Sequence, residues 1–180
     1  MRVSHPLHVL VVCTGNICRS PLAERLLRTR LGDLVSVRSA GTHGLDAWEM
    51  EPNAAAELER RGGDPAGHSS RRIGTDDVDE ADLVLTMTTA QRTDVLADQP
   101  LAMSRTFTLL EFAALLDQHD GPFDRTATVR GLARRRGAAT LEDYDVADPM
   151  GQSPEVHAAV AETIAEAVDR IARRLGAVTG

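Results

Sequence analysis

The sequence predicts a single α/β domain, in which a four-stranded parallel sheet carries helices on both faces and a phosphate-binding loop follows the first strand. Short apolar runs alternate with amphipathic helical patterns along the chain. The runs contain few polar alternations, as expected for strands that are covered on both faces. A length of 180 residues suits one hydrophobic core. Because strands alternate with helices, right-handed crossovers and an open, doubly wound sheet are expected.

Four short apolar runs are the expected strands. They lie at His8–Cys13, Leu34–Ser39, Leu83–Thr86 and Arg105–Leu109. One helical pattern opens at Ser20-Pro21, and others are expected at Pro52–Arg61, Thr89–Ala97 and Leu110–Gln118. Such sheets bind their ligands beyond the carboxyl ends of the strands. Cys13 lies at one of those ends, where a ligand is expected.

The last helix has the clearest start and stop signals. Ser153 is its expected N-cap, Pro154 takes the first helical position, and Gly176 follows the end. Between them, apolar residues recur at helical spacing, at Val156, Val160, Ile164, Val168, Ile171 and Leu175.

Residues 1–180 are expected to form one domain, with a possible insertion at about 120–140. This stretch is basic, since it contains Arg125, Arg130, Arg134, Arg135 and Arg136. The pattern is typical of an exposed helix or a mobile insertion. Docking of an acidic partner is the alternative.

Composition excludes several classes of protein. With 42% hydrophobic and 26% charged residues the chain is globular, and no apolar run is long enough to cross a membrane. The N-terminus lacks the long apolar segment of an export signal, so a cytoplasmic location is expected. A net charge of −7 disfavours nucleic acid and anionic membranes as partners. Two cysteines and no Cys/His cluster predict neither a metal nor another cofactor. A monomer is favoured.

Residues 12–21, Val-Cys-Thr-Gly-Asn-Ile-Cys-Arg-Ser-Pro, are the most informative stretch. A loop between a strand end and a helix start directs backbone N–H groups and the positive end of the helix dipole inward, which attracts anions. The same field favours a thiolate at Cys13, and Arg19 adds a fork of donors that matches phosphate oxygens. Gly15 and Asn16 tolerate the left-handed backbone that such a loop requires. The loop is therefore expected to bind a phosphate that Cys13 attacks. The alternative is an inert core cysteine.

This stretch resembles the signature loop of the low-molecular-weight protein tyrosine phosphatases, in their bacterial branch. Further segments are similar to the family in the same order: Ser39-Ala40-Gly41-Thr42, His68-x-x-Arg71, and Asp148-Pro149 followed by Gly151 and a final helix. The resemblance implies metal-independent hydrolysis of phosphotyrosine in proteins through a phosphocysteine intermediate.

The resemblance also implies roles for individual residues. Cys13 would be the nucleophile, Arg19 the phosphate clamp and Asp148 the general acid and base. The loop residues Thr14, Gly15, Asn16, Ile17, Cys18 and Ser20 would bind the substrate. Ser39 and His68 would join Asn16 and Ser20 in a network that holds the loop open. Without the resemblance, Asp148 would be interpreted as a surface residue in a turn. Asp143 and Asp145 are lesser candidates for the acid.

Two loop residues have a second interpretation. Ser20 can donate its hydroxyl to the Cys13 sulfur or cap the helix, and it can do both. Cys18 is either a small buried residue or a resolving thiol that forms a reversible disulfide with Cys13. Family precedent favours the resolving thiol.

Ile17 and Trp48 bear on the substrate. Phosphoarginine phosphatases that resemble this family carry Thr at the position of Ile17, so Ile17 favours phosphotyrosine. Trp48 could wall the pocket by stacking on an aromatic substrate, or it is a packing residue. The same chemistry on phosphoarginine or a small phosphomonoester remains an alternative, as does a phosphoryl-binding regulatory module with little turnover.

Overall fold

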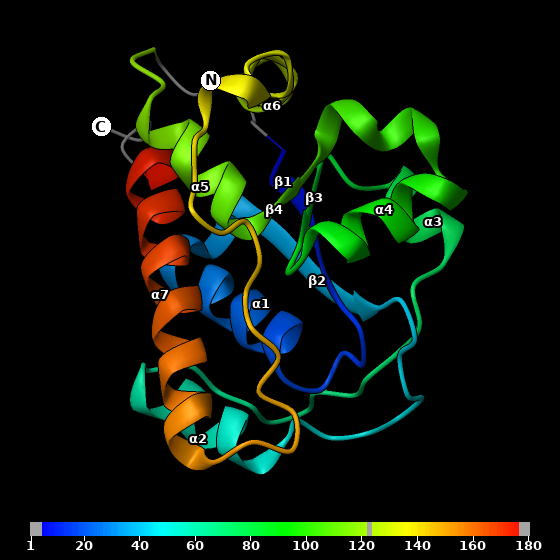
Figure 1. Cartoon of the computed structure of the whole chain (residues 1–180), viewed down its shortest axis with the longest axis vertical. Coiled ribbons are helices and arrows are strands. Elements are labelled where there is room, and N and C mark those ends of the chain that lie inside the picture. The colour runs from blue at the N-terminus through cyan, green and yellow to red at the C-terminus, as the bar shows by residue number, and fades with distance from the viewer. Residues whose placement is uncertain (1–4, 122–123, 177–180) are drawn as a thin grey trace.

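A parallel sheet with strand order β2-β1-β3-β4 forms the centre of the computed structural model, which describes residues 5–121 and 124–176 (Figure 1). Its strands are β1 (Leu7–Cys13), β2 (Val35–Gly41), β3 (Leu83–Thr86) and β4 (Thr106–Thr108). All three strand pairs are parallel. The predicted four-stranded α/β fold is confirmed, and the strand ends differ from the expected ones by up to two residues.

Helices cover both faces of this sheet, as expected. They are α1 (Arg19–Leu31), α2 (Pro52–Arg60), α3 (Thr75–Asp79), α4 (Thr89–Asp98), α5 (Leu109–Asp117), α6 (Arg125–Arg134) and α7 (Pro154–Gly176), with 3₁₀ turns η1 (Gly32–Leu34), η2 (Pro100–Arg105) and η3 (Arg136–Ala138). The Ser153 carbonyl accepts the His157 N–H at 3.1 Å, which is the bond expected of an N-cap. No described helix is both long and apolar enough to cross a membrane.

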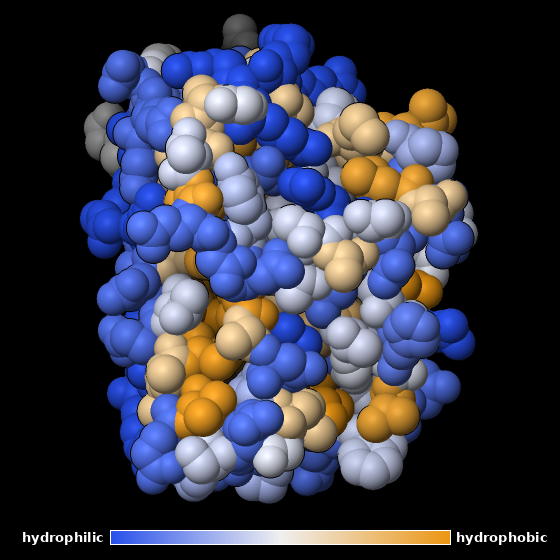
Figure 2. Space-filling view, in the orientation of Figure 1, coloured by the Kyte–Doolittle hydropathy of each residue, from blue (hydrophilic) through white to orange (hydrophobic). Residues whose placement is uncertain are grey.

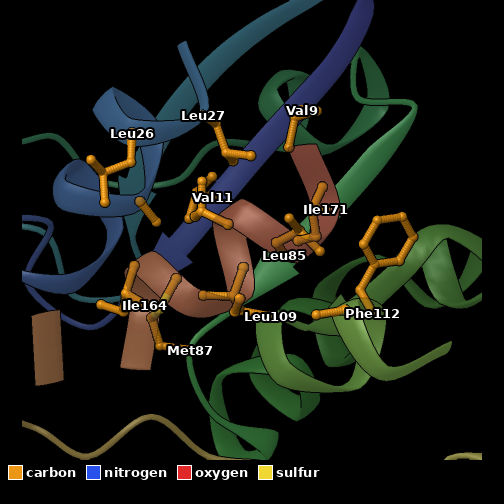
Figure 3. Close-up of a cluster of buried hydrophobic side chains, with 14 of the residues drawn as sticks. Val9, Val11, Leu26, Leu27, Leu85, Met87, Leu109, Phe112, Ile164 and Ile171 are labelled. Carbon is orange, nitrogen blue, oxygen red and sulfur yellow. The ribbon is translucent and has the colours of Figure 1, made fainter. Parts of the chain in front are cut away.

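Alternate residues of β1 point into two separate cores. Val9 and Val11 belong to the larger core, which α1, α5 and α7 complete (Figure 3). Leu10 and Val12 belong to the smaller core, under α3 and α4. Because burying one such side chain stabilises the fold by about 1.5–3 kcal/mol, this alternation fixes the orientation of β1 and of Cys13 at its end.

Hydrophilic side chains line the left edge of the molecule beside α7, whereas hydrophobic ones appear both toward α4 and in the lower part of the view (Figure 2). Leu101 and Met103 of η2 are among the exposed hydrophobic residues.

The first helix begins one residue earlier than expected, at Arg19. Cys18 occupies the N-cap position and no side chain caps the helix, so the prediction that Ser20 is the N-cap is wrong. Ser20 lies inside the first turn because the loop runs into the helix without a break. Its hydroxyl is turned toward the Cys13 sulfur, which was the other role expected of it.

The basic stretch near 120–140 forms α6 and η3, and residues 122 and 123 lie outside the described part of the chain. Val129 and Leu132 are buried. Arg136 stacks on the Phe107 ring at 4.5 Å and donates to the carbonyls of Met103 and Thr106. Arg130 and two further arginines of this segment remain exposed. The stretch is thus packed on the β4 side of the sheet, and its status as an insertion stays a prediction.

Candidate active site

Residues 13–19, the cysteine loop, fold around the Cys13 sulfur at the end of β1. The backbone N–H of Asn16 donates to this sulfur at 3.2 Å, and the Ser20 hydroxyl lies 2.9 Å from it. Ser20 Oγ accepts from Asn16 Nδ2 at 3.0 Å, which leaves the hydroxyl proton free to be donated to the sulfur. Both donors are therefore directed at the atom that is the expected nucleophile.

Asn16 connects the cysteine loop to other segments of the chain through hydrogen bonds. It is fully buried and adopts the left-handed conformation with φ +58°, as expected, whereas Gly15 does not have a positive φ. Its Nδ2 also donates to Ser39 Oγ at 2.8 Å, and its Oδ1 accepts the Arg71 N–H at 3.0 Å. His68 Nε2 donates to its carbonyl at 2.7 Å. The structure thus brings together the four residues of the expected network.

Glu24 extends this network, and sequence reasoning missed it. Ser39 Oγ donates to its buried carboxylate, which also pairs with Arg28 at 2.9 Å. The sequence signal for Glu24 is a carboxylate on the apolar face of the first helix with an arginine one turn later, which indicates a buried and paired side chain. Glu24 therefore holds the end of β2 against α1.

Gly41 allows β2 to approach the cysteine loop. Thr42 donates its N–H to the Cys13 carbonyl, and His43 donates to the Thr14 carbonyl, both at 2.9 Å. A Cβ at Gly41 would lie 2.4 Å from the Thr14 oxygen, which no side chain can tolerate. The segment that resembles the family at Ser39–Thr42 thus buttresses the loop through its backbone.

Arg19 and Asp148, the expected clamp and acid, meet in the structure. The Arg19 guanidinium is 5% exposed and donates to the Val146 carbonyl at 3.0 Å. Its Nη2 lies 3.2 Å from Asp148 Oδ2, and the Asp148 side chain is 54% exposed. Asp148 Oδ1 also accepts the Met150 N–H at 3.2 Å. The two charged groups therefore border the same solvent-accessible space.

The acid loop, residues 142–150, is part of the segment that runs between α6 and α7 (Figure 1). The Asp145 carboxylate accepts the Thr89 N–H at the start of α4 at 2.7 Å, where the helix dipole favours negative charge. Val146 donates to the Met87 carbonyl at 2.8 Å, and Asp143 accepts the Asp145 N–H at 2.9 Å. Of the two lesser candidates, Asp145 thus anchors the loop to α4, and Asp143 makes a bond within the loop.

Gln91 connects α4 to the cysteine loop and was also missed. Its Nε2 donates to Thr14 Oγ1 at 3.0 Å, while its Oε1 accepts the N–H groups of Met87 and Thr88, each at 3.0 Å. Thr88 and Gln91 form a capping box, and the Thr-x-x-Gln pattern is a sequence signal for it. Gln91 is buried, so its contact with Thr14 is sheltered from water.

Cys18 is a buried residue of the cysteine loop. Its sulfur donates to Met150 Sδ at 3.3 Å, and both cysteines are free thiols. Burial raises the pKa of the Cys18 thiol to about 12, and the nearby Glu51 carboxylate adds to this rise. Cys18 is therefore protonated near neutral pH. A disulfide with Cys13 stays a prediction.

An open cleft lies over the loop and is lined by Thr14, Arg19 and Asp148, together with residues of α4 and Thr42-His43. Trp48 is not among the lining residues. It is 58% exposed, and its backbone N–H and carbonyl pair with Ser70. A role for Trp48 in substrate binding stays a prediction. Within residues 5–121 and 124–176, no three His, Cys, Asp or Glu side chains converge as a metal site would require.

A model of the family described as low molecular weight phosphotyrosine protein phosphatase matches residues 8–124. A protein-arginine-phosphatase of Geobacillus stearothermophilus is 32% identical over 170 residues, which cover 94% of this chain and 97% of that protein. The low molecular weight protein-tyrosine-phosphatase Etp of Escherichia coli K12 is 40% identical over 114 residues, which cover 63% and 74% of the two chains.

Solved structures agree with these sequence matches. The YwlE arginine phosphatase from Geobacillus stearothermophilus superimposes with a TM-score of 0.75 at 31% identity, covering 96% of this chain and 94% of the other. The tyrosine phosphatase Wzb from Escherichia coli K30, in complex with sulphate, gives 0.73 at 26%, covering 94% and 98%. Fold, loop and relatives define a phosphoric monoester hydrolase. The chain belongs to the low molecular weight phosphotyrosine protein phosphatase family.

Proposed function

We propose that the protein hydrolyses phosphotyrosine in proteins through a phosphocysteine intermediate. The observation that carries this proposal is the arrangement around Cys13: two donors face the sulfur, and the buried guanidinium of Arg19, at the end of the same loop, lies 3.2 Å from the Asp148 carboxylate. A module that only binds phosphoryl groups needs neither a nucleophile nor an acid, so this set favours turnover.

In the first step the Cys13 sulfur attacks phosphorus in line with the tyrosine oxygen. The sulfur–phosphorus bond forms as the phosphorus–oxygen bond breaks, and Asp148 gives its proton to the departing oxygen. Arg19 and the backbone amides of residues 14–19 hold the charge on the three equatorial oxygens.

In the second step water attacks the phosphocysteine. Asp148, now a carboxylate, takes a proton from this water, and the sulfur–phosphorus bond breaks to release inorganic phosphate. The Cys13 thiolate is regenerated, and no other group needs to change its oxidation state or charge.

Ile17 favours tyrosine over arginine as the phosphorylated residue. Its side chain is 7% exposed and lies beside Gly15, since a Cβ at Gly15 would be 3.6 Å from Ile17 Cγ1. A branched apolar group at this place suits an aromatic ring better than a guanidinium. The expected partner is thus a phosphotyrosyl protein. A reducing cytoplasm would keep both thiols free, and a monomer suffices because the whole site comes from one chain.

Phosphoarginine in proteins is the second candidate substrate, because the similarity to a protein-arginine-phosphatase extends over 94% of the chain. Matched peptides that carry either phosphotyrosine or phosphoarginine test the choice. Wild type is expected to prefer phosphotyrosine, and Ile17→Thr should raise kcat/KM for phosphoarginine by about 10-fold.

Ile17→Val is the matched control, because valine has the shape of threonine without the hydroxyl. It should keep the preference of the wild type. If the wild type hydrolyses the phosphoarginine peptide faster than the phosphotyrosine peptide, the second candidate replaces the first.

A further inference from the structure

A second hollow of about 630 Å³ lies next to the candidate active site. One wall is the segment from Arg72 to Thr75, which leads into α3, and the other wall is the exposed side of α4. Both helices lie on the same side of the molecule in Figure 1. We refer to this space as the α4 hollow.

The α4 hollow adjoins the cleft over the cysteine loop. Thr42, His43 and Asp94 line both spaces. A phosphotyrosine in the cleft would therefore place neighbouring residues of its own chain in or beside the α4 hollow. A small phosphomonoester has no such residues and would occupy the cleft alone.

The two walls carry opposite charges. Asp94 and Asp98 lie four residues apart on α4 and hence on one face, about 6 Å apart along the helix axis. Both are exposed and line the hollow, and Arg72 lies exposed on the opposite wall. Two residues that line both spaces bear titratable groups: His43 contacts Thr42, and Asp94 has no bonded partner among the described residues.

These carboxylates differ from the others around the site. Asp145, Glu24 and Asp77 each accept hydrogen bonds or pair with arginine. Within the described part of the chain, Asp94 and Asp98 take part in no ion pair or side-chain hydrogen bond, although both stand near a site that must attract an anion. Unpaired negative charge there weakens the attraction for phosphate, and a cation on the substrate would offset this effect.

We propose that the α4 hollow binds the residues that flank phosphotyrosine in the substrate protein, and that Asp94 and Asp98 recognise a basic side chain among them. The inference rests on the proposed function and specifies its substrate class. Arg72, on the opposite wall, favours an acidic flanking residue on that side. The preferred substrate is thus a phosphotyrosine segment with a basic residue directed toward α4.

Kinetics with a set of phosphotyrosine peptides test this inference. A single arginine is moved through the positions on either side of phosphotyrosine, and each peptide is compared with its alanine counterpart. Because exposed ion pairs are individually weak, wild type should prefer the best arginine peptide by roughly 5- to 10-fold in kcat/KM. Salt should reduce this preference, since screening acts strongly on exposed charges.

Variants assign the preference to the two carboxylates. Each kcat/KM is divided by the same variant's value for p-nitrophenyl phosphate, which reports the chemistry without flanking residues. Asp94→Asn with Asp98→Asn should remove the preference, and Asp98→Lys should shift it toward a glutamate peptide. Glu166→Gln, at an exposed position of α7, is the control and should behave as wild type.

The inference would be overturned if wild type had equal kcat/KM for the arginine and alanine peptides, or if the double variant kept the preference. The proposed function would still stand in either case, because the phosphotyrosine peptides would be hydrolysed. If phosphotyrosine peptides are not hydrolysed at all, the proposed function fails. In that case the inference is tested by binding: calorimetry measures the affinity of the Cys13→Ser variant for the peptides. Equal affinities for the arginine and alanine peptides would contradict recognition by the α4 hollow.

Discussion

The cysteine loop and the acid loop contribute to the same site but are held in different ways. Cys13, Asn16 and Ser20 are buried, and Asn16 alone is bonded to residues from three segments of the chain, at Ser20, at Ser39 and at His68–Arg71. Asp148 is 54% exposed, and the acid loop is held mainly through Asp145 and Val146.

The difference follows from what each loop has to do. Donors that stabilise a transition state are most effective when they are fixed before the reaction, so the cysteine loop is rigidly supported. The proposed acid, Asp148, would have to reach leaving groups of different shape and allow the substrate to enter, so a loop attached at a few points is sufficient. Replacing Cys13 in the first loop should therefore cost the most activity, and substitutions that only loosen the second loop should reduce it by degrees.

The largest loss is expected from replacing the nucleophile or the clamp. Cys13→Ser should reduce turnover of p-nitrophenyl phosphate by at least about 10⁴-fold, and Arg19→Lys by roughly 10²–10³-fold, because lysine lacks the planar fork. Wild-type activity should be unchanged in EDTA. Appreciable turnover by Cys13→Ser would contradict the phosphocysteine route.

Asp148→Asn comes next. It should lower kcat for phenyl phosphate by roughly 10²–10⁴-fold, since the phenoxide then leaves without a proton. The loss should be smaller for p-nitrophenyl phosphate, whose leaving group needs no proton. Equal losses on both substrates would show that Asp148 is not the acid.

Asn16→Ala tests the support of the cysteine loop. It should lower kcat by about 10²-fold because the loop amides lose their positions. It should also reduce the free energy of unfolding by about 2–4 kcal/mol, because buried partners lose their bonds. Asn53→Ala is the control, since Asn53 makes a single partly buried bond to Glu51. Comparable effects of the two variants on kcat would contradict a special role for Asn16.

Asp145→Asn tests the anchor of the acid loop. A weaker bond to the start of α4 should reduce kcat for phenyl phosphate by about 3- to 10-fold, because the acid is less well placed. The loss should shrink on p-nitrophenyl phosphate, as for Asp148→Asn. Asp143→Asn, whose carboxylate accepts only a bond within the loop, should have less effect.

The smallest effect concerns Cys18 and pH. Burial raises the pKa of this thiol from 9.0 to about 12, so the folded state keeps the proton that the unfolded state releases. The stabilisation is complete below pH 9 and is lost as the pH rises from 9 toward 12. Urea unfolding between pH 8 and pH 11 should show a steeper loss of stability for wild type than for Cys18→Ala. Parallel profiles would contradict the buried, protonated thiol.

Local patterns predicted much of the molecule. Apolar runs located the strands, and one ten-residue motif located Cys13, Arg19 and the left-handed Asn16. The partners that complete the site depend on segments distant in sequence. Glu24, Gln91 and the close approach at Gly41 become evident only when β2 and α4 are placed beside the loop. Of the two roles expected for Ser20, the contact with the Cys13 sulfur is present, and the cap is wrong because the loop runs into the helix without a break.

The arginines beside the two outer strands have a further consequence. Arg28 donates to the Val37 carbonyl of β2 at 3.0 Å, and Arg136 donates to the Thr106 carbonyl of β4. Outer strands with free carbonyls are templates on which other chains can add strands and aggregate. Each outer strand of this sheet thus has a bulky cation bonded to a carbonyl that an added strand would need, and this disfavours edge-to-edge pairing of two sheets.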